Sequence, residues 1–209
     1  MVRLASVQHN GMTKLVAQLS SEKGGGYCDL TSIASNVREF FIVEGLIQAN
    51  ELIAQTSLSS SSNYISADDC HLLAPIDGSL VGKFLCIGMN YKDHCTEQDV
   101  EIPTEPLVFS KFASDCIVGP GDAVAKDEHT EKLDYEVELG VVIGASVPRY
   151  TSKEDVHKYV GGFTVIHDVS ARYVLYSTLL YIRRKKSFLM MLFRYCNYEL
   201  NSDLLDSYI

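Results

Sequence analysis

The chain has 209 residues, of which 46% are apolar and 22% charged, and this balance excludes a disordered or collagen-like protein. Its formal net charge of −9 argues against a nucleic-acid-binding surface, which needs clustered Lys and Arg. A site for an acidic metabolite would therefore need a local positive element, and a bound metal is the natural one. The apolar runs are too interrupted by charge to predict a transmembrane segment.

Cysteine spacing and the first residues bear on the compartment. The six cysteines form no C-x₂-C or C-x₄-C pair, so neither a zinc ribbon nor an iron–sulfur cluster is expected, and reduced thiols are the intracellular default. The first 21 residues contain Arg3 and Lys14 but no acid, which faintly resembles a mitochondrial transit peptide. We prefer the alternative, in which 3–7 and 14–19 are strands of a hairpin. The compartment is predicted to be mitochondrial or cytoplasmic.

Residues 1–57 have the pattern of a small β/α domain. The two short strands are followed by a glycine turn at 24–26, a strand at 27–30 and a helix from about 36 to 55. In that helix Phe40, Val43, Ile47 and Leu52 recur at helical spacing. The segment 58–71 begins with a run of serines and predicts a flexible linker.

Residues 72–172 read as a second domain built mainly of strands. Short apolar runs separated by Gly, Pro and Asp predict strands at 83–87, 107–111, 133–143 and 162–168, with one short helix at 153–160. Many strands and few helices predict an α+β, mainly β fold rather than a Rossmann sheet. Consistent with this, the sequence contains no dinucleotide-binding, Walker A or nucleophile-elbow motif.

The last segment, 173–209, differs in composition from everything before it. It contains neither Gly nor Pro, and four consecutive basic residues at 183–186 break its apolar run. We interpret it as a divergent tail that is not part of the preceding fold. An amphipathic helix lying on a membrane surface is the alternative.

Two glutamates on one predicted strand form the first candidate site. Side chains alternate between the faces of a strand, so Glu136 and Glu138 share one face at roughly 6–7 Å from each other. Two carboxylates on a buried face need a shared proton, a nearby cation or a metal ion. All-oxygen ligands suit Mg²⁺ or Ca²⁺. A solvated face of a surface strand is the simpler explanation for the pair alone.

A third acid, Asp168, ends the apolar strand at 162–168. Glu136, Glu138 and Asp168 together would supply three oxygens of an octahedron and leave three positions for water or a chelating substrate. Separately, His94 and Glu97 would lie on one side of a helical turn after the strand at 83–87. A carboxylate bonded to one imidazole nitrogen raises the basicity of the other, so the pair predicts a general base that can activate water.

Three motifs in order carry a family resemblance: IGMNYKDHCTE at 87–97, LDYEVEL at 133–139 and HDVSAR at 167–172. Their order and spacing resemble the motif series of the fumarylacetoacetate hydrolase superfamily. The resemblance implies a mixed β-roll, usually a homodimer, with Mg²⁺, Ca²⁺ or Mn²⁺ held by Glu136, Glu138 and Asp168. It also implies catalytic roles for His94 and Glu97 on a closing lid. Substrate contacts are implied for Lys111 and Arg172, with structural anchoring as the alternative.

The implied substrates are 2-oxo acids, chelated through their 2-oxo and carboxylate oxygens. A divalent cation would polarise the carbonyl and stabilise an enolate, which serves tautomerisation, decarboxylation and carbon–carbon hydrolysis alike. Resemblance to a eukaryotic branch favours oxaloacetate keto–enol tautomerisation, with acylpyruvate hydrolysis or oxaloacetate decarboxylation as alternatives. The motifs are followed only to Arg172, so we expect a partial β-roll, truncated there. An inactive variant that binds a full-length partner is the alternative of another class.

Overall fold

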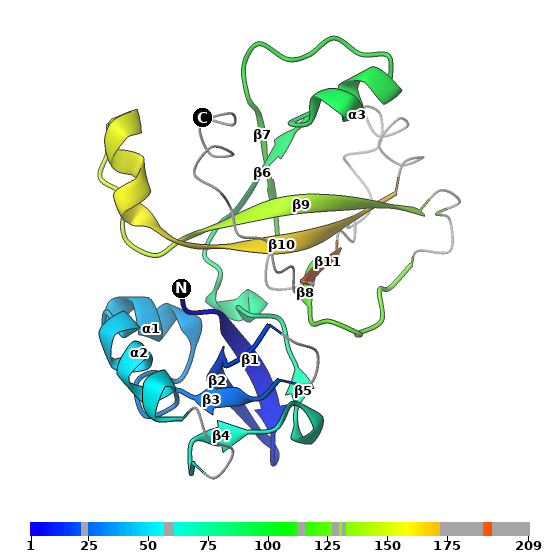
Figure 1. Cartoon of the computed structure of the whole chain (residues 1–209). Helices are drawn as coiled ribbons and strands as arrows, with labels where there is room; N and C mark the ends of the chain where they lie inside the picture. The colour runs from blue at the N-terminus through cyan, green and yellow to red at the C-terminus, as the bar shows by residue number, and fades with distance from the viewer. Residues whose placement is uncertain are drawn as a thin grey trace.

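The structure is a computed structural model that describes residues 1–21, 25–56, 61–112, 116–126, 130 and 133–171, and the backbone of 190–193. Two bodies of secondary structure follow each other along the chain, a compact N-terminal one and a more open one built around two long strands (Figure 1). The fold is α+β and mainly β, as predicted. Within the described residues, none of the helices has the length and apolar character needed to cross a membrane.

The N-terminal body is a five-stranded sheet packed against two helices. Its strands are β1 (Leu4–His9), β2 (Met12–Gln18), β3 (Tyr27–Asp29), β4 (Tyr64–Ile65) and β5 (His71–Leu72), in the order β4-β3-β2-β1-β5. The predicted hairpin is confirmed: β1 pairs with β2, and Asn10 and Gly11 turn the chain with φ of 49° and 75°. Buried Leu15, Leu30 and Phe40 belong to the core between sheet and helices.

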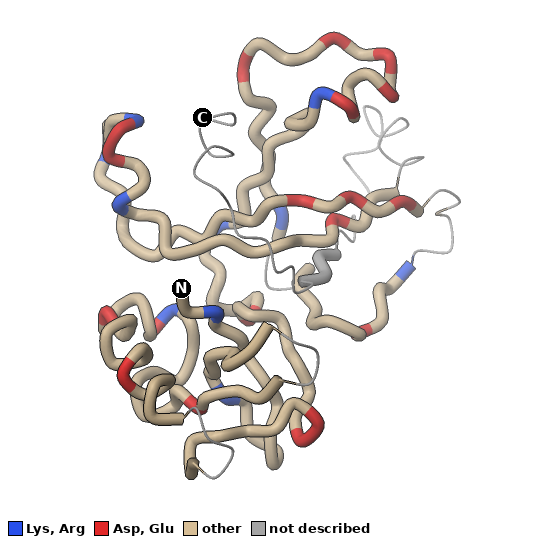
Figure 2. The backbone as a smooth tube through the Cα atoms, in the orientation of Figure 1, with Lys and Arg blue, Asp and Glu red and all other residues tan. Residues whose placement is uncertain are grey.

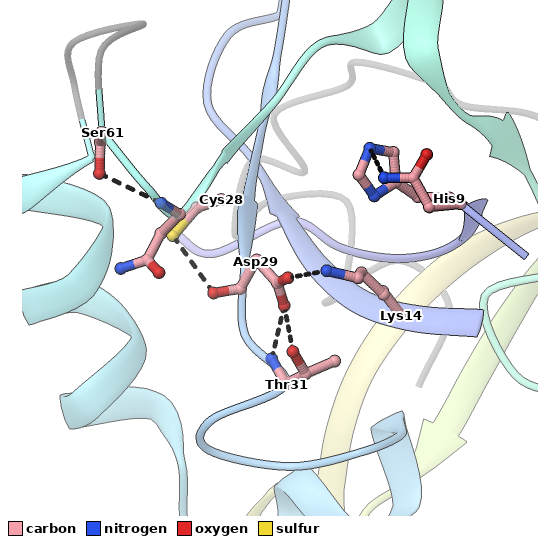
Figure 3. A network of polar contacts seen from close by, with 8 residues as sticks. His9, Lys14, Cys28, Asp29, Thr31 and Ser61 are labelled. Carbon is pink, nitrogen blue, oxygen red and sulfur yellow. Dashed lines mark hydrogen bonds and ion pairs between the residues drawn. The ribbon is translucent and has the colours of Figure 1, made fainter. Parts of the chain in front are cut away.

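One polar network ties the edge of this core together (Figure 3). Lys14 Nζ lies 2.5 Å from Asp29 Oδ2, and the other oxygen of that carboxylate accepts from the backbone N–H of Thr31 at 2.9 Å and from its hydroxyl. Asp29 is largely buried, and these hydrogen bonds compensate for its lost hydration. The network is structural, because it links β2, β3 and the turn that follows.

The prediction of a single helix from 36 to 55 is wrong, because the segment forms two helices. α1 (Val37–Ile42) is capped by Asn36, whose side chain accepts from the Glu39 N–H at 2.9 Å, and α2 (Leu46–Gln55) begins after Gly45. Glu44 adopts a φ of 51°, and a Cβ on Gly45 would stand 2.8 Å from the Phe40 ring. The left-handed residue and the close approach break the helix, although the apolar spacing continues through it.

Part of the predicted linker contributes to the N-terminal sheet. Within 58–71, β4 pairs with β3, and His71 begins β5, which pairs with β1. Tyr64 and Ile65 are good strand formers, and Ile65 is buried, so their burial fixes a segment that serine content alone marks as flexible. The domain boundary itself stays a prediction.

The second body contains a two-stranded and a four-stranded sheet. β6 (Phe84–Gly88) pairs with β7 (Leu107–Lys111), and α3 (Lys92–Glu97) lies in the connection between them. β8 (Ile117–Val118), β11 (Met190–Phe193), β10 (Val160–Ala171) and β9 (Leu133–Ile143) form the other sheet in that order. The helix predicted at 153–160 is a 3-10 helix over Lys153–Tyr159. The strands predicted at 83–87, 107–111, 133–143 and 162–168 are all present.

A short piece of the predicted tail joins this sheet. β11 runs antiparallel to β10 and parallel to β8, so its backbone is part of the same hydrogen-bonded ladder. The rest of 173–209 lies outside the described residues, as does Arg172.

One face of the antiparallel pair of β9 and β10, which we call the long hairpin, is apolar and exposed. Leu133, Tyr135, Val137, Leu139, Val141 and Ile143 alternate along β9 and are all solvent-accessible, with Tyr135 70% and Val137 65% exposed. Among the described strands β9 has a neighbour on one side only. An apolar sheet face that the described residues leave uncovered is a candidate contact surface.

Candidate metal and substrate site

The sheet register brings the three predicted carboxylates to one face. β9 and β10 pair antiparallel with Asp168 opposite Glu136 and Ile166 opposite Glu138. Residues that are directly opposite point to the same side, as do residues two apart on one strand. Glu136, Glu138 and Asp168 therefore form a contiguous acidic patch, and Figure 2 shows acidic positions gathered along these strands.

This patch is one wall of an open cavity of about 1830 Å³. The opposite walls come from β6, β7 and the loop and helix that follow β6. The predicted site residues among the lining are His94, Glu97, Lys111, Glu136, Glu138 and Asp168. The structure thus brings together every predicted site residue that it describes. Their chemical roles stay predictions.

Lys111 brings a positive charge to the patch. It ends β7, its side chain is 3% exposed, and its Nζ forms an ion pair with Asp168 Oδ2, whose side chain is 10% exposed. The second oxygen, Asp168 Oδ1, is buried and has no hydrogen-bond partner among the described residues. A buried carboxylate oxygen without a partner is costly, so this atom has the capacity to bind a further ligand.

Glu138 is held in an environment that disfavours its charge. Burial raises the pKa of this carboxyl, and the negative charges of Glu136 and Asp168 raise it further. Hydrogen bonds from Asn90 and Tyr91 act in the opposite direction without cancelling the rise. Asn90 Nδ2 donates to Glu138 Oε2 at 3.1 Å.

The thiol of Cys86, on β6, is affected by the same charged groups. Burial raises the pKa of its thiol, Lys111 lowers it, and the charges of Asp168 and Glu138 raise it. These groups are therefore within electrostatic reach of one thiol on the cavity wall. Sequence reasoning missed both Cys86 and Asn90. Strand alternation from Gly88 places Cys86 on the inner side, and Asn90 lies inside the motif at 87–97.

The predicted His94–Glu97 pair is present on α3. His94 Nδ1 lies 3.8 Å from Glu97 Oε2, which is within ion-pair range but longer than a direct hydrogen bond. His94 is three-quarters buried and Glu97 is mostly exposed. Cys95 between them is buried, and it fixes this helix against the loop before it. The pair can orient an imidazole at the mouth of the cavity.

The three carboxylates are of the ligand type that a hard divalent cation prefers, although their oxygens do not converge on one position. No group of three or more His, Cys, Asp or Glu in the described part of the chain is arranged to hold a metal ion as it stands. The unpartnered Asp168 Oδ1 leaves one buried oxygen of the patch open to a ligand, and burial together with the neighbouring carboxylates raises the pKa of Glu138. Carboxylate oxygens are the ligands that Mg²⁺ and Ca²⁺ prefer, so Glu136, Glu138 and Asp168 would hold such an ion.

The fold is mainly β, and the acidic face of β9 and β10 and the His–Glu pair on α3 line one cavity. The chain belongs to the fumarylacetoacetate hydrolase family: residues 83–189 match the family described as "Fumarylacetoacetate (FAA) hydrolase C-terminal". The matched range runs on past Arg172 to residue 189, so the prediction that the resemblance ends at Arg172 is wrong.

Among curated relatives, the chain is 39% identical over 176 residues to "Oxaloacetate tautomerase fahd2, mitochondrial" of Xenopus laevis, which covers 82% of this chain and 53% of the relative. It is 40% identical over 157 residues to "Oxaloacetate tautomerase FAHD2A, mitochondrial" of Bos taurus, covering 74% and 48%. The chain thus spans about half the length of the curated relatives it matches.

Solved structures show the same fold. Fumarylacetoacetate hydrolase from psychrophilic Exiguobacterium antarcticum matches with a TM-score of 0.62 at 26% identity, covering 86% of this chain and 60% of that one. The structure titled "Crystal structure of Cg1458 with inhibitor" matches with a TM-score of 0.68 at 20% identity, covering 93% and 65%. The second likeness supports the fold alone.

Proposed function

We propose that this chain carries the cation-binding part of a divalent-metal-dependent enzyme that acts on 2-oxo acids, with oxaloacetate keto–enol tautomerisation as its reaction. The observation that carries the proposal is the facing arrangement of Glu136, Glu138 and Asp168 over one cavity. The names of the mitochondrial tautomerases that are 39% and 40% identical to it over 176 and 157 residues support the substrate and the compartment.

The residues present suggest a division of labour. Glu136, Glu138 and Asp168 would hold Mg²⁺, Ca²⁺ or Mn²⁺, which when bound supplies positive charge to stabilise an enolate oxygen. Lys111 neutralises one oxygen of Asp168 and leaves the other for ligation. His94, oriented by Glu97, would take the proton from C3 of oxaloacetate, and a proton delivered to the C2 oxygen completes the enol.

Carbon–carbon hydrolysis of an acylpyruvate is the second candidate. The specific observation in its favour is the His94–Glu97 pair, because hydrolysis needs an activated water whereas tautomerisation needs only proton movement. The family-implied homodimer and the decarboxylation of oxaloacetate stay predictions. A non-catalytic alternative, binding to a full-length relative, is motivated by the exposed apolar face of β9.

The proposal is tested by cation binding and turnover measured on the same preparation. Calorimetric titration with Mg²⁺ and Mn²⁺ should show one stoichiometric site, and the ultraviolet absorbance of enol-oxaloacetate should follow tautomerisation. Glu136→Gln should abolish cation-dependent turnover, while Glu51→Gln, an exposed change on α2, should not affect it. Unchanged turnover in the Glu136 variant would sink the assignment.

A second comparison separates the reactions. His94→Ala should reduce hydrolysis of an acylpyruvate more than cation binding, with exposed His157→Ala as the matched control. If the chain neither binds a cation nor turns over substrate, but lowers the activity of a full-length relative when the two are mixed, the non-catalytic alternative replaces the enzyme.

A further inference from the structure

The connection from β6 to α3 is a short, strained turn. Met89 adopts a φ of 54°, in the left-handed region that costs a non-glycine residue about 1–2 kcal/mol. Such a conformation persists where surrounding contacts fix it. Here Cys95, 1% exposed on α3, places its Sγ 3.6 Å from the Met89 carbonyl oxygen and donates its N–H to Tyr91 O at 3.2 Å.

This turn directs Asn90 at the acidic patch. The Asn90 side chain comes from an exposed loop residue, yet its Nδ2 reaches across to Glu138 Oε2 on β9 at 3.1 Å. The next residue, Tyr91, also hydrogen-bonds this carboxylate through its side chain, and Tyr91 is the N-cap residue directly before α3. Two consecutive residues at the start of the helix that carries His94 and Glu97 therefore contact one candidate ligand.

An amide is well suited to such a contact. It donates a hydrogen bond to a carboxylate without adding charge, so it fixes the rotamer of Glu138 and specifies which oxygen is already used. Residues that hydrogen-bond a metal ligand in this way typically change metal affinity by about 10–100-fold when they are removed. A purely structural role would instead be to anchor α3 to β9.

We propose that Asn90 is a positioning residue for the cation site: it fixes one oxygen of Glu138 and, through the same turn, places α3 against the cavity. The proposal rests on the proposed function, because it assumes that Glu138 is a cation ligand. It goes beyond that function because Asn90 is neither a cation ligand nor a base. Its role is to link the carboxylates on β9 and β10 to the helix that carries His94 and Glu97.

The test is direct cation binding, followed by the electron paramagnetic resonance signal of free Mn²⁺ during titration. Asn90→Ala should weaken Mn²⁺ affinity about 10–100-fold. Asn90→Leu, which keeps the approximate size but cannot donate a hydrogen bond, should weaken it as well. Asn50→Ala on α2 is the matched control, since Asn50 Nδ2 bonds only within its own helix to Leu46 O at 2.9 Å, and it should not change the affinity.

Thermal unfolding in EDTA separates positioning from folding. The proposal requires that Asn90→Ala melts within a few degrees of the unsubstituted chain while losing affinity. Equal affinity in Asn90→Ala, undiminished affinity in Asn90→Leu, or a loss of affinity that follows loss of structure overturns it. If the unsubstituted chain and Asn50→Ala also bind no Mn²⁺, the proposed function itself fails; if they bind and only the Asn90 result is negative, only this inference fails.

Discussion

The buried Lys111–Asp168 ion pair gives the sharpest prediction for stability. In Lys111→Met the apolar stem is retained, but the cation beside Asp168 is removed from a site where the two side chains are only 3% and 10% exposed. One Asp168 oxygen already lacks a partner among the described residues, so the substitution leaves a buried carboxylate with no counter-charge there. Breaking a buried pair by removing one partner costs about 3–5 kcal/mol.

This loss is large against a total stability of about 5–15 kcal/mol. At about 2–4 °C per kcal/mol for a chain of this size, it corresponds to a fall in melting temperature of roughly 6–20 °C. Calorimetric or circular-dichroism melts in EDTA measure it. The double variant Lys111→Met/Asp168→Leu is the control, because it removes both charges and should recover most of the loss.

Divalent cation adds a second arm to the same experiment. Mg²⁺ should restore part of the melting temperature of Lys111→Met, since a bound cation replaces the missing positive charge beside Asp168. A loss below about 1 kcal/mol for Lys111→Met would refute the reasoning, because that is the value of a solvent-exposed pair. Equal melting of the single and double variants would refute it as well.

Two further predictions concern the N-terminal body and its contact with the long hairpin. Burial raises the pKa of Asp29, but hydrogen bonds from Lys14 and from the hydroxyl and backbone N–H of Thr31 lower it overall below 3.8. The ionised carboxylate therefore stabilises the fold above pH 3.8, and this stabilisation is lost as the pH falls through the lowered pKa. In urea titrations Asp29→Asn should be about 1–3 kcal/mol less stable than the unsubstituted chain at pH 7. The difference should shrink in acid. A Cβ on Gly161 would stand 2.7 Å from the Phe41 ring, so Gly161→Ala should cost about 1–3 kcal/mol in the same assay. Gly162→Ala, where a Cβ meets nothing within 4 Å, should cost less, and equal losses would contradict the packing explanation.

Strand existence and the shared face of the carboxylates followed from the sequence, because period-two alternation is a local property. Glu136 and Glu138 two apart must share a face whatever the partner strand does. That Asp168 lies directly opposite Glu136 did not follow from alternation, since register depends on the pairing of distant strands.

Other features needed contacts that no local pattern encodes. The break at Gly45 depends on a close approach to Phe40, and the strand at Tyr64 depends on burial of Ile65 against the sheet. Lys111 was predicted near the substrate, but its partner is Asp168, a candidate ligand. Asn90 carried no signal of its own, because a loop amide is ordinary until its acceptor is known.

The strands that carry the three carboxylates differ in how firmly they are held. β10, with Asp168, is hydrogen-bonded on both sides by β9 and β11, whereas β9 has only one neighbour among the described strands. Two of the three candidate ligands, Glu136 and Glu138, therefore lie on a strand with one free edge among the described residues, and the third, Asp168, lies on a strand paired on both sides.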